Sequence, residues 1–162
     1  MELNDQLVAN EPKKMTLGIN ILTILTFIGS AWELYSAVSS YFTSSKALEE
    51  FDKAQEKLST APAFVRKLAG PEARELMAKS IENKVPLLII SLIAISLCVY
   101  GAIEMRKLKK QGYALWLIGE VLPYIALFLF VGTIVLKTVV VYFMFFPLLF
   151  ILLYTLQRKH LN

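Results

Sequence analysis

Four long apolar segments alternate with polar ones along this chain. The apolar segments cover residues 15–41, 85–103, 113–134 and 138–156, and none of them contains more than one charged residue. Each approaches or exceeds the roughly 20 apolar residues with which a helix crosses about 30 Å of hydrocarbon. The pattern therefore predicts an all-α fold, a bundle of four transmembrane helices that forms a single membrane domain over residues 1–162.

Residues 43–84 form the one long polar insertion, between the first two apolar segments. Its eight basic residues nearly balance its seven acidic ones, and apolar residues recur at steps of three or four over 48–58 and 73–81. This is the period of an amphipathic helix. We expect a helical cap outside the membrane. This cap lies on the membrane surface or folds over the bundle; the alternative is that it offers a docking surface to a partner protein.

Local signals divide this cap into shorter helices. Ser44 or Ser45 is expected to cap the first, Pro62 to lie in the first turn of a short second one, and the Gly70-Pro71 pair to begin a third.

The first apolar segment permits two interpretations. It follows Lys13 and Lys14 and contains the small-residue triplet 29–31, an order that also occurs in secretory signal peptides. Helix-compatible apolar residues continue past the triplet to Tyr41. This continuation favours a retained spanning helix, with a cleaved leader as the alternative.

Composition supports a membrane protein and excludes several classes of function. Hydrophobic residues make up 56% of the chain and charged residues only 19%, which is unusual for a soluble domain and argues against a soluble enzyme, a nucleic-acid-binding module or a disordered tail. The single cysteine, Cys98, lies inside an apolar segment, and the single histidine is His160. We therefore expect no disulfide, metal site, cofactor or catalytic residue.

Cations near the predicted spans indicate orientation. Short loops rich in lysine and arginine remain in the cytoplasm, and with four crossings these cations fall on one side of the bundle. Both termini are then cytoplasmic, whereas residues 43–84 and the turn that contains Lys137 lie outside. The cations concerned are Lys13, Lys14, Arg106, Lys107, Lys109, Lys110, Arg158 and Lys159.

Two stretches, residues 20–30 and 107–116, resemble those of uncharacterised small four-span bacterial integral membrane proteins. The resemblance would cover nearly the whole chain. It implies a location in the bacterial inner membrane and supplies neither an activity nor a catalytic residue.

Charges near or within the spans need a partner, an aqueous route or a position at the edge, because an ionisable group at mid-membrane costs about 2.5–3.5 kcal/mol. Glu104 lies one turn from Arg106 and Lys107. It can reach the interface or pair locally, and it is expected to be a solvated carboxylate at a helix end. Glu33 and Lys137 are expected near the outer boundary, where each can extend to water or the two can form an ion pair; a transport role is the third reading.

Glu120 lies seven residues after Tyr113 and thus about 10 Å into the third segment. Pro123 follows three residues later and leaves the carbonyl of Gly119 without its helical donor. The carboxylate, the glycine and the free carbonyl together form a polar spot. Its role is interpreted either as structural, with a protonated glutamate hydrogen-bonded to a neighbouring hydroxyl, or as a site for a proton or substrate.

These patterns predict a non-enzymatic membrane protein, an accessory or scaffolding subunit that binds another membrane protein or associates with itself. The alternative is a small proton- or ion-coupled carrier or channel that uses Glu120 as its titratable site. The expected partners are the lipid bilayer and another membrane protein or a second copy, and no nucleic acid is expected.

Overall fold

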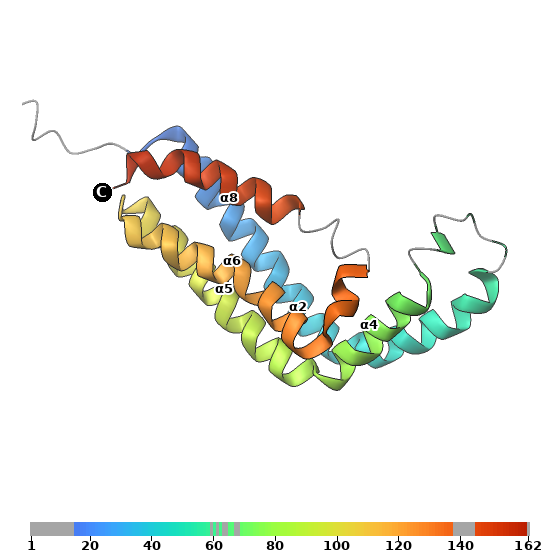
Figure 1. Cartoon of the computed structure of the whole chain (residues 1–162). Coiled ribbons are helices and arrows are strands. Elements are labelled where there is room, and N and C mark those ends of the chain that lie inside the picture. Colours follow the sequence, from blue (N-terminus) through green and yellow to red (C-terminus); the bar gives the residue numbers. More distant parts are fainter. Residues whose placement is uncertain are drawn as a thin grey trace, which may run out of the picture.

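The computed structural model describes residues 15–58, 60, 62, 65–66, 69–137 and 145–161, and this part of the chain is helical (Figure 1). Its elements are α2 (Leu17–Leu58), α4 (Pro71–Glu82), α5 (Lys84–Arg106), α6 (Lys110–Val131), the 3₁₀ segment η1 (Thr133–Lys137), α8 (Phe145–Gln157) and the 3₁₀ segment η2 (Arg158–His160). The all-α prediction is confirmed for these residues.

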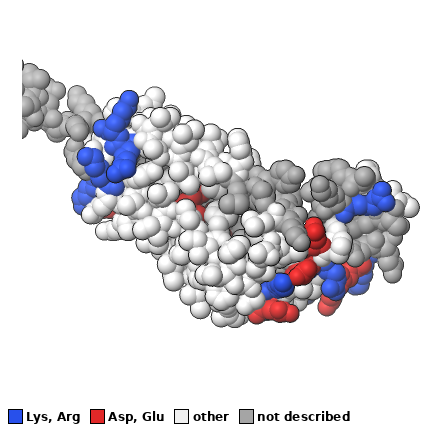
Figure 2. All heavy atoms as spheres, viewed as in Figure 1, with Lys and Arg blue, Asp and Glu red and all other residues white. Residues whose placement is uncertain are grey.

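Three of the helices are long and apolar enough to cross a membrane. They are α2 over Leu17–Ala54, α5 and α6, and they contain the first three predicted spans or most of them. The charge distribution agrees: Figure 2 shows cations gathered at one end of the molecule, acids and bases mixed at the other, and a largely uncharged surface between. The chain is therefore a multi-span helical membrane protein.

Helix α2 is longer than the sequence analysis predicts. It runs through Ser44 and Ser45 without a break and extends past the apolar segment, so the prediction of a new helix capped by one of these serines is wrong. No glycine or proline occurs between residues 30 and 59, and the Ala, Leu, Glu and Lys of the polar part are strong helix formers. With 42 residues, α2 is about 63 Å long.

Helix α4 packs against the outer part of α2, which is the polar stretch 43–58 that follows the apolar segment. It begins with Pro71 after Gly70, which confirms the predicted start of a helix at this pair. Arg74 of α4 donates two hydrogen bonds to the Asp52 carboxylate of α2, at 2.7 and 2.8 Å. Most residues of the short helix expected after Pro62 lie outside the described part of the chain.

Helices α5 and α6 form the tightest pair in the described structure, because glycines let their backbones touch. A Cβ atom on Gly101 would lie 2.6 Å from the Trp116 nitrogen, one on Gly112 2.6 Å from the Gly101 oxygen, and one on Gly119 2.7 Å from the Ala94 oxygen. Gly112, Gly119 and the buried Ala126 are spaced by seven residues along α6. They therefore recur on one helix face, which is turned to α5.

The fourth predicted span is described only in its second part. Helix α8 has 13 residues, about 20 Å, which is shorter than the hydrocarbon core; residues 138–144 lie outside the described part. Helix α8 ends beside the start of α2, where the Thr16 hydroxyl donates a hydrogen bond to Gln157 Oε1 at 3.3 Å. The last helix thus returns to the end of the bundle at which α2 begins.

Candidate functional site

A cavity of about 410 Å³ lies between α2, α5, α6 and α8. Its walls combine apolar and aromatic side chains with a few polar groups. The polar groups are Thr26, Ser30 and Glu33 from α2, Cys98 from α5, and Glu120 and Tyr124 from α6. The cavity therefore holds two carboxylates that lie 87 positions apart in the sequence.

Glu120 occupies the middle of α6. It lies ten residues after Lys110 and eleven before Val131, or about 15 Å along the helix from either end. The single S–H of Cys98 has two acceptors, the Trp116 carbonyl oxygen at 3.7 Å and Glu120 Oε2 at 4.0 Å from the sulfur. Among the described residues, the polar contact of Glu120 is thus with a thiol. The hydroxyl partner expected from the sequence stays a prediction.

Gly119 and Pro123 shape the wall around Glu120. A Cβ atom on Gly119 would lie 2.7 Å from Cys98 Sγ, so the glycine allows α5 to bring the thiol to the carboxylate. Pro123 lies inside α6, where it cannot donate to the Gly119 carbonyl. The polar spot predicted around Glu120 thus faces α5 and the cavity.

Glu33 reaches the same cavity from α2. None of the ion pairs among the described side chains involves Glu33 or Glu120. The side chain of Lys137 lies outside the described part, so its predicted ion pair with Glu33 stays a prediction. No signal in the sequence places Glu33 and Glu120 together.

A buried polar contact joins α2 and α8 beside the cavity. The hydroxyls of Thr26 and Tyr154 lie 2.7 Å apart and share a hydrogen bond, and the Tyr154 ring contacts Trp116 with 4.3 Å between ring centroids. Tyr154 is the buried residue of α8. One side chain thereby links α8 to both α2 and α6.

Glu104, at the end of α5, is not the solvated carboxylate that the sequence analysis expected. Its side chain is 2% exposed, and it accepts bonds from Lys107 at 2.8 Å and Lys109 at 2.7 Å, and from Gln111 at 3.1 Å. Burial is tolerated because two ammonium groups surround the carboxylate. The hydrogen bond to Glu104, together with the negative charge of that carboxylate, raises the pKa of Lys107.

The chain folds back sharply to form this cluster. Leu108 adopts a φ of 60°, in the left-handed region that only glycine enters without strain. The Lys109 N–H then donates to the Glu104 carbonyl at 3.1 Å, which places both lysines on the same carboxylate.

Six of the eight predicted orientation signals lie at this end of the bundle. Four lie at the α5–α6 turn and two in η2, and the guanidinium of Arg158 lies 5.5 Å from the centre of the Tyr113 ring. Lys13 and Lys14 lie outside the described residues. The cations thus gather at one end of the bundle, and the assignment of that end to the cytoplasm stays a prediction.

Comparison with known protein families, with curated proteins and with solved structures finds no match to this chain. The resemblance to small four-span bacterial membrane proteins stays a prediction.

Proposed function

We propose that this multi-span membrane protein carries a proton or a small cation across the bilayer, with Glu33 and Glu120 as its intramembrane site. The observation that carries this proposal is that both carboxylates line one cavity and form no ion pair within the described residues. Two negative charges in one low-dielectric cavity repel each other. A proton or a bound cation removes that repulsion.

Helix α8 is the element best suited to open this site. Its first turn lines the cavity through Phe146 and Pro147, whereas Tyr154 alone among its described residues is buried. Moving the first turn of α8 breaks fewer contacts than separating α5 from α6, whose backbones touch. In this proposal, movement of α8 alternates with cation binding.

Flux measurements in vesicles test the carrier function. We expect wild-type protein in liposomes to dissipate an imposed pH or cation gradient, reported by a dye trapped inside. Glu120→Gln and Glu33→Gln should each lower the initial rate about tenfold or more, because each removes a charge that the site uses. Glu49→Gln, on the exposed outer part of α2, is the matched control. Absence of flux with wild-type protein contradicts the proposal, and so does an unchanged rate when both glutamates are replaced by glutamine.

The proposed topology has four crossings, with both termini in the cytoplasm of a bacterial inner membrane. The positive end of the bundle and the return of α8 to the start of α2 support it. Single cysteines at Glu49 and Lys110 in a Cys98→Ala background test it in intact cells. An impermeant thiol reagent should label the first position only, and labelling of the second contradicts the orientation.

A second candidate function is that of an accessory or scaffolding subunit that binds another membrane protein or a second copy. It is favoured by α8, where Phe145, Leu148, Leu152 and Leu156 are all more than half exposed. Light scattering of protein extracted in mild detergent should then show a complex larger than 18.3 kDa, and Leu152→Trp should dissociate it. A wild-type monomer without partners contradicts this second candidate.

A further inference from the structure

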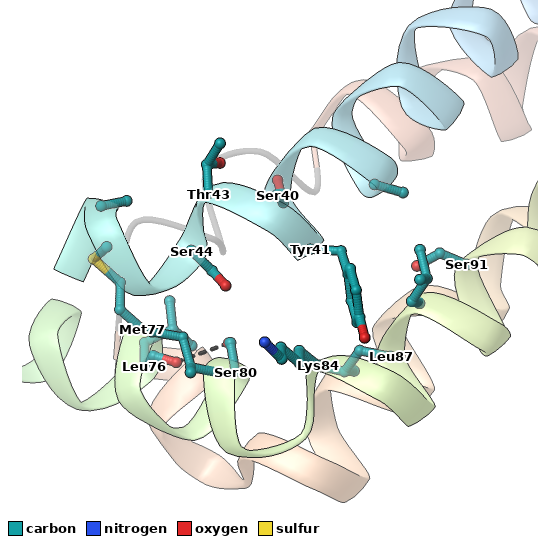
Figure 3. A pocket seen from close by; sticks show the side chains of 14 residues that line it. Ser40, Tyr41, Thr43, Ser44, Leu76, Met77, Ser80, Lys84, Leu87 and Ser91 are labelled. Atoms are coloured by element: carbon teal, nitrogen blue, oxygen red, sulfur yellow. Dashed lines mark hydrogen bonds between the residues drawn. The ribbon is translucent and has the colours of Figure 1, made fainter.

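A second cavity, of about 340 Å³, lies between α2, α4 and α5 (Figure 3). It shares no lining residue with the cavity that holds Glu33 and Glu120. One part of its wall is apolar, with Leu76 and Met77 from α4 and Leu87 and Leu88 from α5; the other part carries hydroxyl groups and one ammonium group. Such a wall suits a ligand with an apolar part and an anionic part.

The position of the cavity along the helices places it at the membrane surface. Lys84 begins α5, and its ammonium lies 5.0 Å from the centre of the Tyr41 ring of α2. Lysine and tyrosine with this arrangement are typical of the headgroup layer. Helix α4 and the outer part of α2 cover the cavity on the polar side, while Leu87, Leu88 and Ser91 continue it along α5 toward the hydrocarbon.

Two polar groups in the cavity lack a hydrogen-bond or ion-pair partner among the described side chains. The Ser44 hydroxyl oxygen is buried and has no hydrogen-bond partner, and Lys84 forms none of the ion pairs among the described side chains. In Figure 3, Ser44 and Lys84 point from opposite helices into the same space. Ser80, by contrast, donates to the Leu76 carbonyl. A buried hydroxyl without a partner costs about 1–3 kcal/mol, and a ligand that accepts its hydrogen bond removes this cost.

We propose that this cavity binds one anionic phospholipid from the adjoining leaflet. The lipid phosphate accepts hydrogen bonds from the Lys84 ammonium and the Ser44 hydroxyl, and the upper part of an acyl chain lies along Leu87 and Leu88. The charge favours this occupant, because Lys84 is the charged residue among those that line the cavity. The open apolar path toward the hydrocarbon distinguishes a lipid from a free phosphate ion.

Native mass spectrometry of delipidated protein tests the site. With phosphatidylglycerol as the probe, we expect one tightly retained lipid, and Lys84→Ala should weaken its binding about five- to tenfold. Lys84→Arg should retain binding, and Lys46→Ala, on the exposed outer part of α2, is the matched control. Equal affinity for phosphatidylcholine, or for soluble glycerol phosphate, overturns the proposal, and so does unchanged binding in Lys84→Ala.

Ser44→Ala supplies a second test that does not depend on the charge. Without phospholipid, this substitution should leave Tm unchanged or raise it, because it removes an unsatisfied hydroxyl. With phosphatidylglycerol, the rise in Tm should be smaller than in wild-type protein. An identical lipid-induced rise shows that the hydroxyl does not contact the phosphate and overturns the proposal. Neither test depends on flux through the cavity of Glu33 and Glu120.

Discussion

At the scale of single residues, the intramembrane charges were found from the sequence, but their surroundings were not. Glu33 and Glu120 stand out because each is the single charge in an apolar segment. Their convergence on one cavity depends on how α2 crosses α6, which no local pattern encodes. The position of Cys98 inside an apolar segment does not predict its contact with Glu120, which follows from the approach of α5 to Gly119.

Glu104 permits a prediction at this scale. Glu104→Gln should lower Tm by several degrees, because Lys107 and Lys109 then meet at a buried group without a negative charge. Glu82→Gln, on the exposed face of α4, should leave Tm unchanged. Thermal unfolding in detergent measures both. Equal Tm values for Glu104→Gln and wild-type protein would show that the carboxylate is solvated after all, as the sequence analysis expected.

At the scale of elements, apolar length located the spans well, and the polar segments were harder to divide. The predicted segments 85–103 and 113–134 are covered, apart from a few residues, by α5 and α6. The glycine contacts between α5 and α6 carry no familiar sequence signal, because Gly112 and Gly119 are seven residues apart and not four. In α2, the serines at 44 and 45 fit a helix cap and a helix interior alike, and the flanking helix formers decided between them.

The glycine contacts predict a clear contrast between substitutions. Gly119→Ala should lower the free energy of unfolding by about 1–3 kcal/mol, because its Cβ meets the backbone of α5. Gly29→Ala has no atom within 4 Å of the new Cβ and should be neutral or stabilising by up to about 1 kcal/mol. Unfolding followed by circular dichroism measures both. Similar effects of the two substitutions would contradict the contact of α5 with α6.

The bond between Thr26 and Tyr154 predicts non-additive effects. Thr26→Val and Tyr154→Phe should each destabilise the protein, because each leaves a buried hydroxyl or its site without a partner. The double variant should lose less than the sum of the two, with a coupling of about 0.6–2 kcal/mol. A double-mutant cycle from unfolding data measures this coupling. Strict additivity would mean that α8 does not bond to α2.

At the scale of the whole molecule, α2 joins the membrane bundle to the polar cap as one rod. About 30 Å of its length suffices to cross the hydrocarbon, and the remaining turns, with α4 bound through Asp52 and Arg74, extend beyond. The second cavity lies where the rod leaves the bundle, so a continuous α2 fixes Tyr41 and Ser44 relative to Lys84. A helix break at Ser44 or Ser45, as their capping pattern predicts, would remove that fixed geometry.

Distance measurement between spin labels decides between the rod and the break. In a Cys98→Ala background, labels at Leu17→Cys and Glu49→Cys are separated by 32 residues of α2, and their backbones should lie about 48 Å apart with a narrow distribution. Ser45→Pro should broaden that distribution and shorten its mean, because proline removes a helical hydrogen bond and clashes with the preceding turn. Ser45→Ala, which preserves the helix, is the control. A broad or markedly shorter distance without the proline would show that the cap helix turns away from the spanning helix near Ser44, and the lipid site proposed between α2, α4 and α5 would then lose the wall that Ser44 provides.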